Sequence, residues 1–211
     1  TYTRDGDVLT LYTSASGLTS LLQSLPTTAY EGATTLKIEG TLSNDDLKQT
    51  TNNELFNTEY SFQSSILGNW LRSSAGSITT LDLSGVNGLT VIPEMAFYGC
   101  GQSDLGNSSL KKVILPEGVV KIDKNAFLFA QITEIVLPAT LKTIGYNALG
   151  DTDLSTAILP QGLEIIEDFA FLGSDVTTLI IPSTVTSIGM MSLPTNYNTA
   201  IVFEGTTYGL L

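Results

Sequence analysis

The sequence predicts a repeat solenoid of the α/β class, because one period runs through most of the chain and each period contains a short strand pattern. A proline, an isoleucine, a small residue and a bulky apolar residue each recur every 22 residues. These sets are Pro116, Pro138, Pro160 and Pro182; Ile122, Ile144, Ile166 and Ile188; Ala126, Ala148, Ala170 and Ser192; and Phe127, Leu149, Phe171 and Leu193. A fixed period of about 20 to 50 residues is the signature of stacked repeats, which present broad contact surfaces. Recognition of a partner is therefore expected in preference to catalysis.

Each repeat is predicted to begin with a short strand that a proline ends. In the copy that starts at Leu110, residues 112–115 alternate in character with the period of two that is typical of a strand. Pro116 has no N–H to offer a neighbouring strand. A second extended piece at 119–122 and a tight helical turn at 125–127 complete the coil. The side chains expected to face inward are Leu110, Val113, Leu115, Val119, Ile122, Ala126 and Phe127.

The chain is predicted to consist of an array with a modified beginning. Residues 78–211 form the array, with an insertion near 101–109 and a last strand at 200–205. Residues 1–77 lack the period and are expected to form an irregular α+β N-terminal cap, because a terminal repeat has to cover its exposed apolar face. Within this cap the patterns predict strands over 8–12 and 35–39, helices over 18–25 and 66–71, and Asn44 as a helix N-cap.

The composition excludes several classes of function. The net charge of -12 at pH 7 disfavours binding to nucleic acid and to anionic membranes, both of which need Lys and Arg. The chain has no histidine and a single cysteine, Cys100, so it has no Ser-His-Asp triad, no His-ligated zinc and no internal disulfide. Pairing between two chains through Cys100 stays open. Acidic groups at 5–7, 151–153 and 164–168 lack the spacing of a calcium loop.

No catalytic, cofactor-binding or metal-ligating residue is predicted, and the chain is not expected to be an enzyme. No stretch of the sequence approaches the roughly 20 apolar residues of a transmembrane helix.

The repeat resembles the BspA-like leucine-rich repeat family. The resemblance lies in the motif L-x-x-I-x-L-P, a following V/L-x-x-I and a tail like Asn125-Ala126-Phe127, and it covers about residues 78–205. It implies a right-handed leucine-rich repeat solenoid in a secreted or surface-anchored protein at the outer surface of a host-associated bacterium. Members are described as adhesins that bind extracellular matrix or other cells, and the family has no catalytic motif. The start at Thr1 fits a processed or trimmed secreted protein as well as it fits a sequence cut at an arbitrary boundary, and it leaves room for a lipid anchor upstream.

One row of outward strand positions is the candidate contact site. In successive repeats it contains Asp82, Ile114, Val136, Ile158 and Ile180. Aligned aliphatic side chains on the solvent face of a sheet form an apolar stripe, and such patches often mark interaction sites. The alternative is that β-branched residues favour strands and pack on one another along the sheet. The expected partner is an extracellular protein or a glycan. Two alternative functions are a structural spacer that presents another domain and a carbohydrate-binding component.

Overall fold

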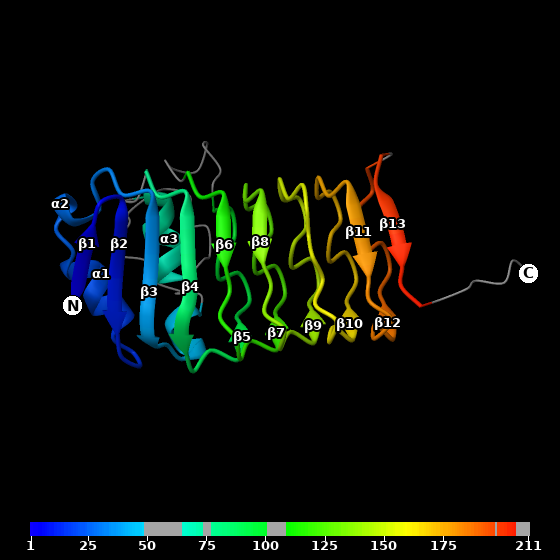
Figure 1. Cartoon of the computed structure of the whole chain (residues 1–211), viewed down its shortest axis with the longest axis horizontal. Coiled ribbons are helices and arrows are strands. Elements are labelled where there is room, and N and C mark those ends of the chain that lie inside the picture. Colours follow the sequence, from blue (N-terminus) through cyan, green and yellow to red (C-terminus); the bar gives the residue numbers. More distant parts are fainter. Residues whose placement is uncertain (49–64, 74–76, 101–108, 197, 206–211) are drawn as a thin grey trace, which may run out of the picture.

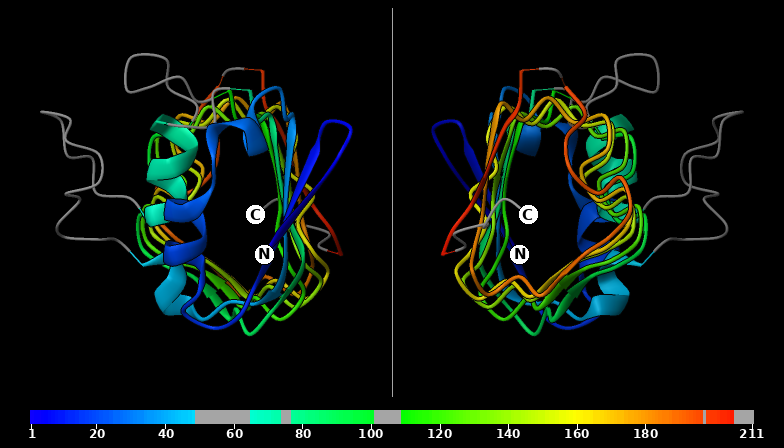
Figure 2. Two further views of the ribbon diagram at one scale, coloured as in Figure 1. Left: turned by 90° about the vertical axis from the view of Figure 1, so that its left-hand side faces the viewer. Right: turned by 90° about the vertical axis from the view of Figure 1, so that its right-hand side faces the viewer.

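The computed structural model describes residues 1–48, 65–73, 77–100, 109–196 and 198–205. In these residues the chain winds through successive coils that are stacked along the long axis of the molecule (Figure 1). Viewed along that axis, the coils overlay one another around a common interior (Figure 2). The insertion predicted near 101–109 lies, apart from Ser109, outside the described residues.

A large sheet forms one wall of the stack. Its strands, in spatial order, are β1 (Tyr2–Asp5), β2 (Val8–Thr13), β3 (Thr35–Thr41), β4 (Thr80–Asn87), β6 (Lys112–Ile114) and β8 (Glu134–Val136). Only the β1–β2 pair of this sheet is antiparallel within the described residues. β3 and β4 run through Gly40 and Gly85, so β3 extends beyond residue 39, where the sequence predicted its end. Gly40 has a φ of 105°, and a Cβ there would collide with the carbonyl oxygen of Thr13.

Two smaller parallel sheets contain the other strands. The first contains, in spatial order, β12 (Ser187–Ile188), β10 (Ile165–Ile166), β9 (Thr143–Ile144), β7 (Lys121–Ile122) and β5 (Val91–Ile92). The second pairs β11 (Thr178–Ile181) with β13 (Ala200–Phe203). The repeating isoleucines face each other directly, since Ile122 pairs with Ile144, Ile144 with Ile166, and Ile166 with Ile188. Each repeat thus adds one short strand to the first of these sheets.

The end of each repeat is a hydrogen-bonded turn and not the tight helical turn that the sequence predicted. Asn125 has a positive φ of 56°, a left-handed conformation that ends any helical path. The backbone N–H groups of Asn125 and Phe127 donate across to the next coil, to the carbonyl oxygens of Tyr146 and Ala148, both at 2.9 Å. The turns therefore form a further ladder of hydrogen bonds between coils.

This left-handed position predicts a stabilising substitution. Asn147 fills it in one coil, whereas Phe169 and Met191 fill it in the next two, with φ values of 61° and 50°. Because Asn enters this region more readily than other non-glycine residues, Met191→Asn is expected to raise the free energy of unfolding by about 0.5–1 kcal/mol. The Met191 side chain is largely exposed, so little packing is lost. Urea denaturation followed by circular dichroism measures the change. Asn147→Met should shift the midpoint the other way, and a lower midpoint for Met191→Asn would contradict the argument.

The interior is filled by the side chains that the repeat pattern predicted. The inward-facing set of the coil from Leu110 is buried throughout, with Leu115 the most exposed member at 4%. Phe97 and Phe127 stack with their ring centroids 5.1 Å apart, and Phe171 is fully buried in the same position of a later coil. Each coil covers its neighbour, so the described residues share one core.

The helices of the described residues lie in the first third of the chain. They are α1 (Leu18–Ser24), α2 (Thr27–Tyr30), the 3-10 helix η1 (Asn44–Leu47) and α3 (Ile66–Ser73). α1 and α3 lie on the wall opposite the large sheet (Figure 2). The apolar residues that predicted these two helices turn inward: Leu18 and Leu22 of α1, and Ile66, Leu67, Trp70 and Leu71 of α3, are buried.

Two local predictions in this part were wrong. The N-cap of η1 is Ser43 and not Asn44: the hydroxyl and the N–H of Ser43 both donate to the Asp46 carboxylate at 2.8 Å. Asn44 instead accepts the N–H of Thr90 at 3.0 Å, which ties the first third to the first repeat. The strand β1 was missed, although Gly6-Asp7, the two-residue loop that joins it to β2, is a hairpin signal.

Cys100 is placed where it cannot pair with a second chain. Its side chain is fully buried, and its Sγ donates to the carbonyl oxygen of Gly68 at 3.6 Å. Burial raises the pKa of the thiol to about 12. At about pH 8 only about 1 in 10,000 thiols is then ionised, and the thiolate is the reactive species. We expect a disulfide reagent to leave the folded protein unmodified and to label it fully in concentrated guanidinium chloride. Rapid labelling of the folded protein would place Cys100 at the surface.

Candidate functional site

The five predicted contact residues lie in one row, which begins in the large sheet and continues to β11. Asp82 lies opposite Ile114, and Ile114 lies opposite Val136. Beyond Val136, two isolated bridges continue the row and place Ile158 between Val136 and Ile180. The strand face at this end is therefore continuous from β4 to β11, along the wall that faces the viewer in Figure 1.

The members of this row differ in how far they reach into solvent. Val136 is 41% exposed, Ile158 85% and Ile180 46%, whereas Asp82 and Ile114 are half-buried. Ile158 lies where the regular ladder is interrupted, since its segment makes only single bridges to the coils on either side. The outward orientation predicted for the row is thus most marked at its centre.

The row contains one residue that the sequence analysis did not include. Val202 of β13 lies opposite Ile180 and is 47% exposed. The signal for it was present, because Val202 follows Ile180 by the same 22 residues that separate the members from Ile114 onward. We call Val136, Ile158, Ile180 and Val202 the apolar stripe.

The sheet face has a charged half and an uncharged half. The charged half contains the ion pairs Lys37–Glu39 at 2.6 Å and Lys112–Glu134 at 2.7 Å. The hydrogen bond to Glu39 raises the pKa of Lys37. In the later coils the outward row beside the stripe consists of Thr156, Thr178 and Ala200, all exposed and none charged. Ile158 and Ile180 therefore lie in a region that a partner can cover without desolvating a charge, whereas Val136 has Glu134 beside it.

The stripe itself consists of aliphatic side chains. Within the parts of the chain that the structure describes, no group of three or more Cys, Asp or Glu residues is placed to hold a metal ion. Aliphatic side chains offer no acid, base or nucleophile. Covering a large exposed aliphatic side chain is worth about 1.5–3 kcal/mol, so a few members of the stripe are enough to contribute substantially to binding.

Comparison with known proteins identifies the repeat. A sequence model described as the BspA type leucine rich repeat region matches residues 73–199 in six copies. The chain belongs to the BspA type leucine-rich repeat family. The family resemblance of the motifs is confirmed, as is a leucine-rich repeat fold, and the sheets of this BspA type protein are parallel from β2 onward.

Three solved bacterial structures are similar to this BspA type protein. A leucine-rich repeat protein from Bacteroides ovatus shares 27% identity over 55% of this chain and 29% of its own, with a TM-score of 0.49. One from Eubacterium ventriosum shares 17% over 88% of this chain and 36% of its own, with a TM-score of 0.44. A leucine rich cell surface protein from Faecalibacterium prausnitzii shares 17% over 96% and 45%, with a TM-score of 0.37.

The BspA type chain spans less than half the length of each of these three proteins. No curated protein matches it. Among its described helices, none has the length and apolar character that crossing a bilayer requires.

Proposed function

We propose that this BspA type protein is a non-catalytic recognition protein of a bacterial surface, and that its apolar stripe binds an extracellular protein. The observation that supports this most directly is Ile158, a large aliphatic side chain that is 85% exposed in the middle of an uncharged face. Strand preference explains a β-branched residue at this position, but packing along the ladder leaves most of this side chain in water.

The chemistry of the stripe favours a protein partner over a glycan for this face. Its four members are aliphatic, whereas sugar rings pack best on flat aromatic side chains. Membership in the family supports a location at the outer surface of the cell, where the protein is secreted or held through a lipid anchor upstream. The net charge of -12 favours partners that are neutral or basic at the point of contact.

The architecture that we propose for recognition of this partner is a single solenoid. Residues 78–211 would form an array with a period of 22 residues, and residues 1–77 would form its N-terminal cap. The register supports this arrangement: Val113 lies opposite Ile135 in the large sheet, and Ile144 opposite Ile166 in the smaller one, both at a separation of 22 residues. A stack of this kind holds the stripe residues at fixed spacing, which keeps the binding face in shape before the partner arrives.

Binding of the purified chain to immobilised extracellular-matrix proteins tests the proposal. Saturable binding at physiological salt, which persists when salt is raised, is expected, because apolar contacts are not screened. The alternative function, a spacer that presents another domain, predicts that this chain alone binds none of them. Absence of saturable binding across the panel would therefore favour the spacer.

A further inference from the structure

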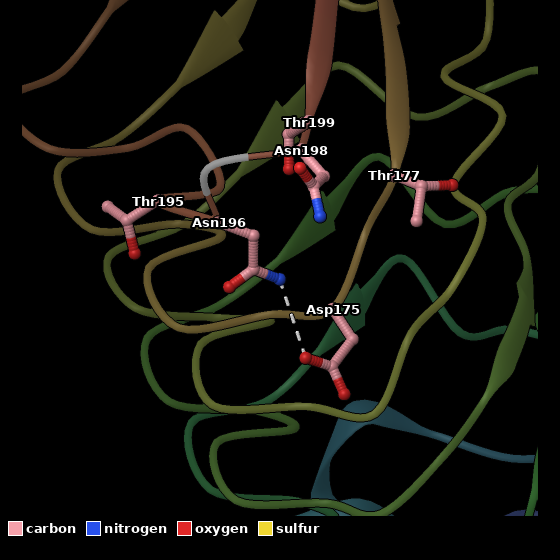
Figure 3. A pocket seen from close by; sticks show the side chains of 6 residues that line it. All are labelled: Asp175, Thr177, Thr195, Asn196, Asn198 and Thr199. Carbon is pink, nitrogen blue, oxygen red and sulfur yellow. Dashed lines mark hydrogen bonds between the residues drawn. The ribbon is translucent and has the colours of Figure 1, made fainter.

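A cavity on the last coils shares no residue with the apolar stripe and has a different chemistry. It has a volume of about 470 Å³ and is lined by Asp175, Thr177, Thr195, Asn196, Asn198 and Thr199 (Figure 3). Its volume is in the range of small-molecule sites, about 300–1,000 Å³. Every lining side chain carries an oxygen, and none is a cation. We propose that this cavity binds a neutral sugar unit.

The cavity forms because the last coil departs from the repeat. In the preceding coil, Gly173 and Ser174 follow the turn, and the Ser174 hydroxyl bonds back to Phe171 at 2.8 Å. One period later the chain has Thr195 and Asn196, which are both exposed. The Asn196 amide donates to the carbonyl oxygen of Ser174 at 2.9 Å and so fixes the wall of the cavity.

Asp175 supplies a carboxylate that is not neutralised. One coil earlier, Asp153 occupies the same position and has Lys111 at 3.6 Å. One repeat later, the position of Lys111 is occupied by Thr133, which carries no charge. Among the described residues Asp175 makes no ion pair, and its only side-chain contact is the Asn196 amide at 3.4 Å on Oδ1. Oδ2 is left to accept from a ligand.

The groups that surround Asp175 match vicinal hydroxyls. Sugar hydroxyls both donate and accept, so a site for them combines an acceptor with amides and hydroxyls that do both. Figure 3 shows Asp175 and Asn196 facing one another, with Asn198 nearby. The side chains of Asn198 and Thr195 form no hydrogen bond within the described residues and are free to bind a ligand. With a carboxylate in the wall and no Lys or Arg, the cavity repels sialic and uronic acids, which leaves neutral hexoses and N-acetylhexosamines.

Saturation-transfer NMR of the whole chain tests the assignment with methyl glucoside, methyl galactoside, methyl mannoside and N-acetylglucosamine as probes. At least one probe should give a saturable signal, and Asn198→Ala and Asp175→Asn should each weaken its affinity about tenfold, the effect of losing one hydrogen bond. Asp153→Asn is the matched control, because it makes the same exchange one coil earlier outside the cavity, and it should leave the affinity unchanged. Ile158→Lys should also leave it unchanged, which separates this site from the stripe.

Three results would overturn the assignment. One is the absence of a saturable signal with all four probes. Another is an affinity that Asn198→Ala and Asp175→Asn leave intact while thermal melting shows both variants folded. The last is a signal that vanishes on adding a calcium chelator, since recognition would then run through a metal ion and not through these side chains directly.

Discussion

The Ile144→Asp variant is expected to lose about 3–5 kcal/mol of its free energy of unfolding, a large part of what a domain of this size possesses. Ile144 is fully buried in β9, between Ile122 and Ile166 of the neighbouring coils. A carboxylate at this point has no cation within the apolar interior and loses its water shell. Because each coil covers the next, the loss should spread to the coils on both sides. Urea denaturation followed by circular dichroism measures it.

A matched control lies on the same ladder. Ile188 pairs with Ile166 just as Ile166 pairs with Ile144, but it belongs to β12 and is 40% exposed. Ile188→Asp introduces the same group at the same position of the repeat where water still reaches it, so the loss should be much smaller. Equal losses in the two variants would mean that burial does not decide the effect.

The pH dependence gives a second test of the same argument. Burial raises the pKa of the introduced carboxyl at position 144 in the folded state above its unfolded value of about 3.9. Below the unfolded value the group is neutral in both states, and the charge penalty is absent. The penalty grows as the pH rises from the unfolded pKa to the folded one, and is complete above it. The difference in free energy of unfolding between variant and parent should therefore narrow on acidification toward pH 4. A constant difference would show that the loss comes from the changed shape of the side chain and not from its charge.

The interior of the repeats was predictable because each coil has to bury its apolar side chains against its neighbours. Ile122, Ala126 and Phe127 are buried for the same reason as their equivalents in the next two coils, Ile144, Ala148 and Leu149 and then Ile166, Ala170 and Phe171, so the period alone identifies them. The first third offers no such repetition. There the choice between Ser43 and Asn44 as N-cap depends on two contacts. The Asp46 carboxylate accepts from the N–H of Ser43, and Asn44 binds Thr90, which is 46 residues away in the sequence.

The candidate site was predictable in its alignment but not in its exposure. The period places Val136, Ile158 and Ile180 in one row, yet their exposure depends on where the ladder is regular. The cavity at Asp175 was harder to find, because its features come from departures from the repeat. The missing Lys partner of Asp175 can be recognised only when the register between coils two periods apart is known.

The Ile158→Lys variant is expected to lower the affinity for a captured matrix protein by at least tenfold while leaving the melting temperature nearly unchanged. A lysine can stay in water in the free protein, since the native side chain is already 85% exposed. In the complex the ammonium group would have to be covered by the partner at the centre of an uncharged face, where unpaired charges cost most. Surface plasmon resonance and differential scanning calorimetry measure the two quantities.

Two further variants separate the stripe from its surroundings. Ile158→Leu keeps an apolar side chain of the same size and should retain the affinity within a few fold. Thr156→Lys adds the same charge two residues away in the row beside the stripe. If the contact depends on the apolar stripe, Thr156→Lys should weaken binding less than Ile158→Lys, because a flexible lysine at the margin can turn its ammonium group to solvent. Equal losses in the two lysine variants would instead show that the partner responds to charge, and that the row of aliphatic side chains is a consequence of strand packing.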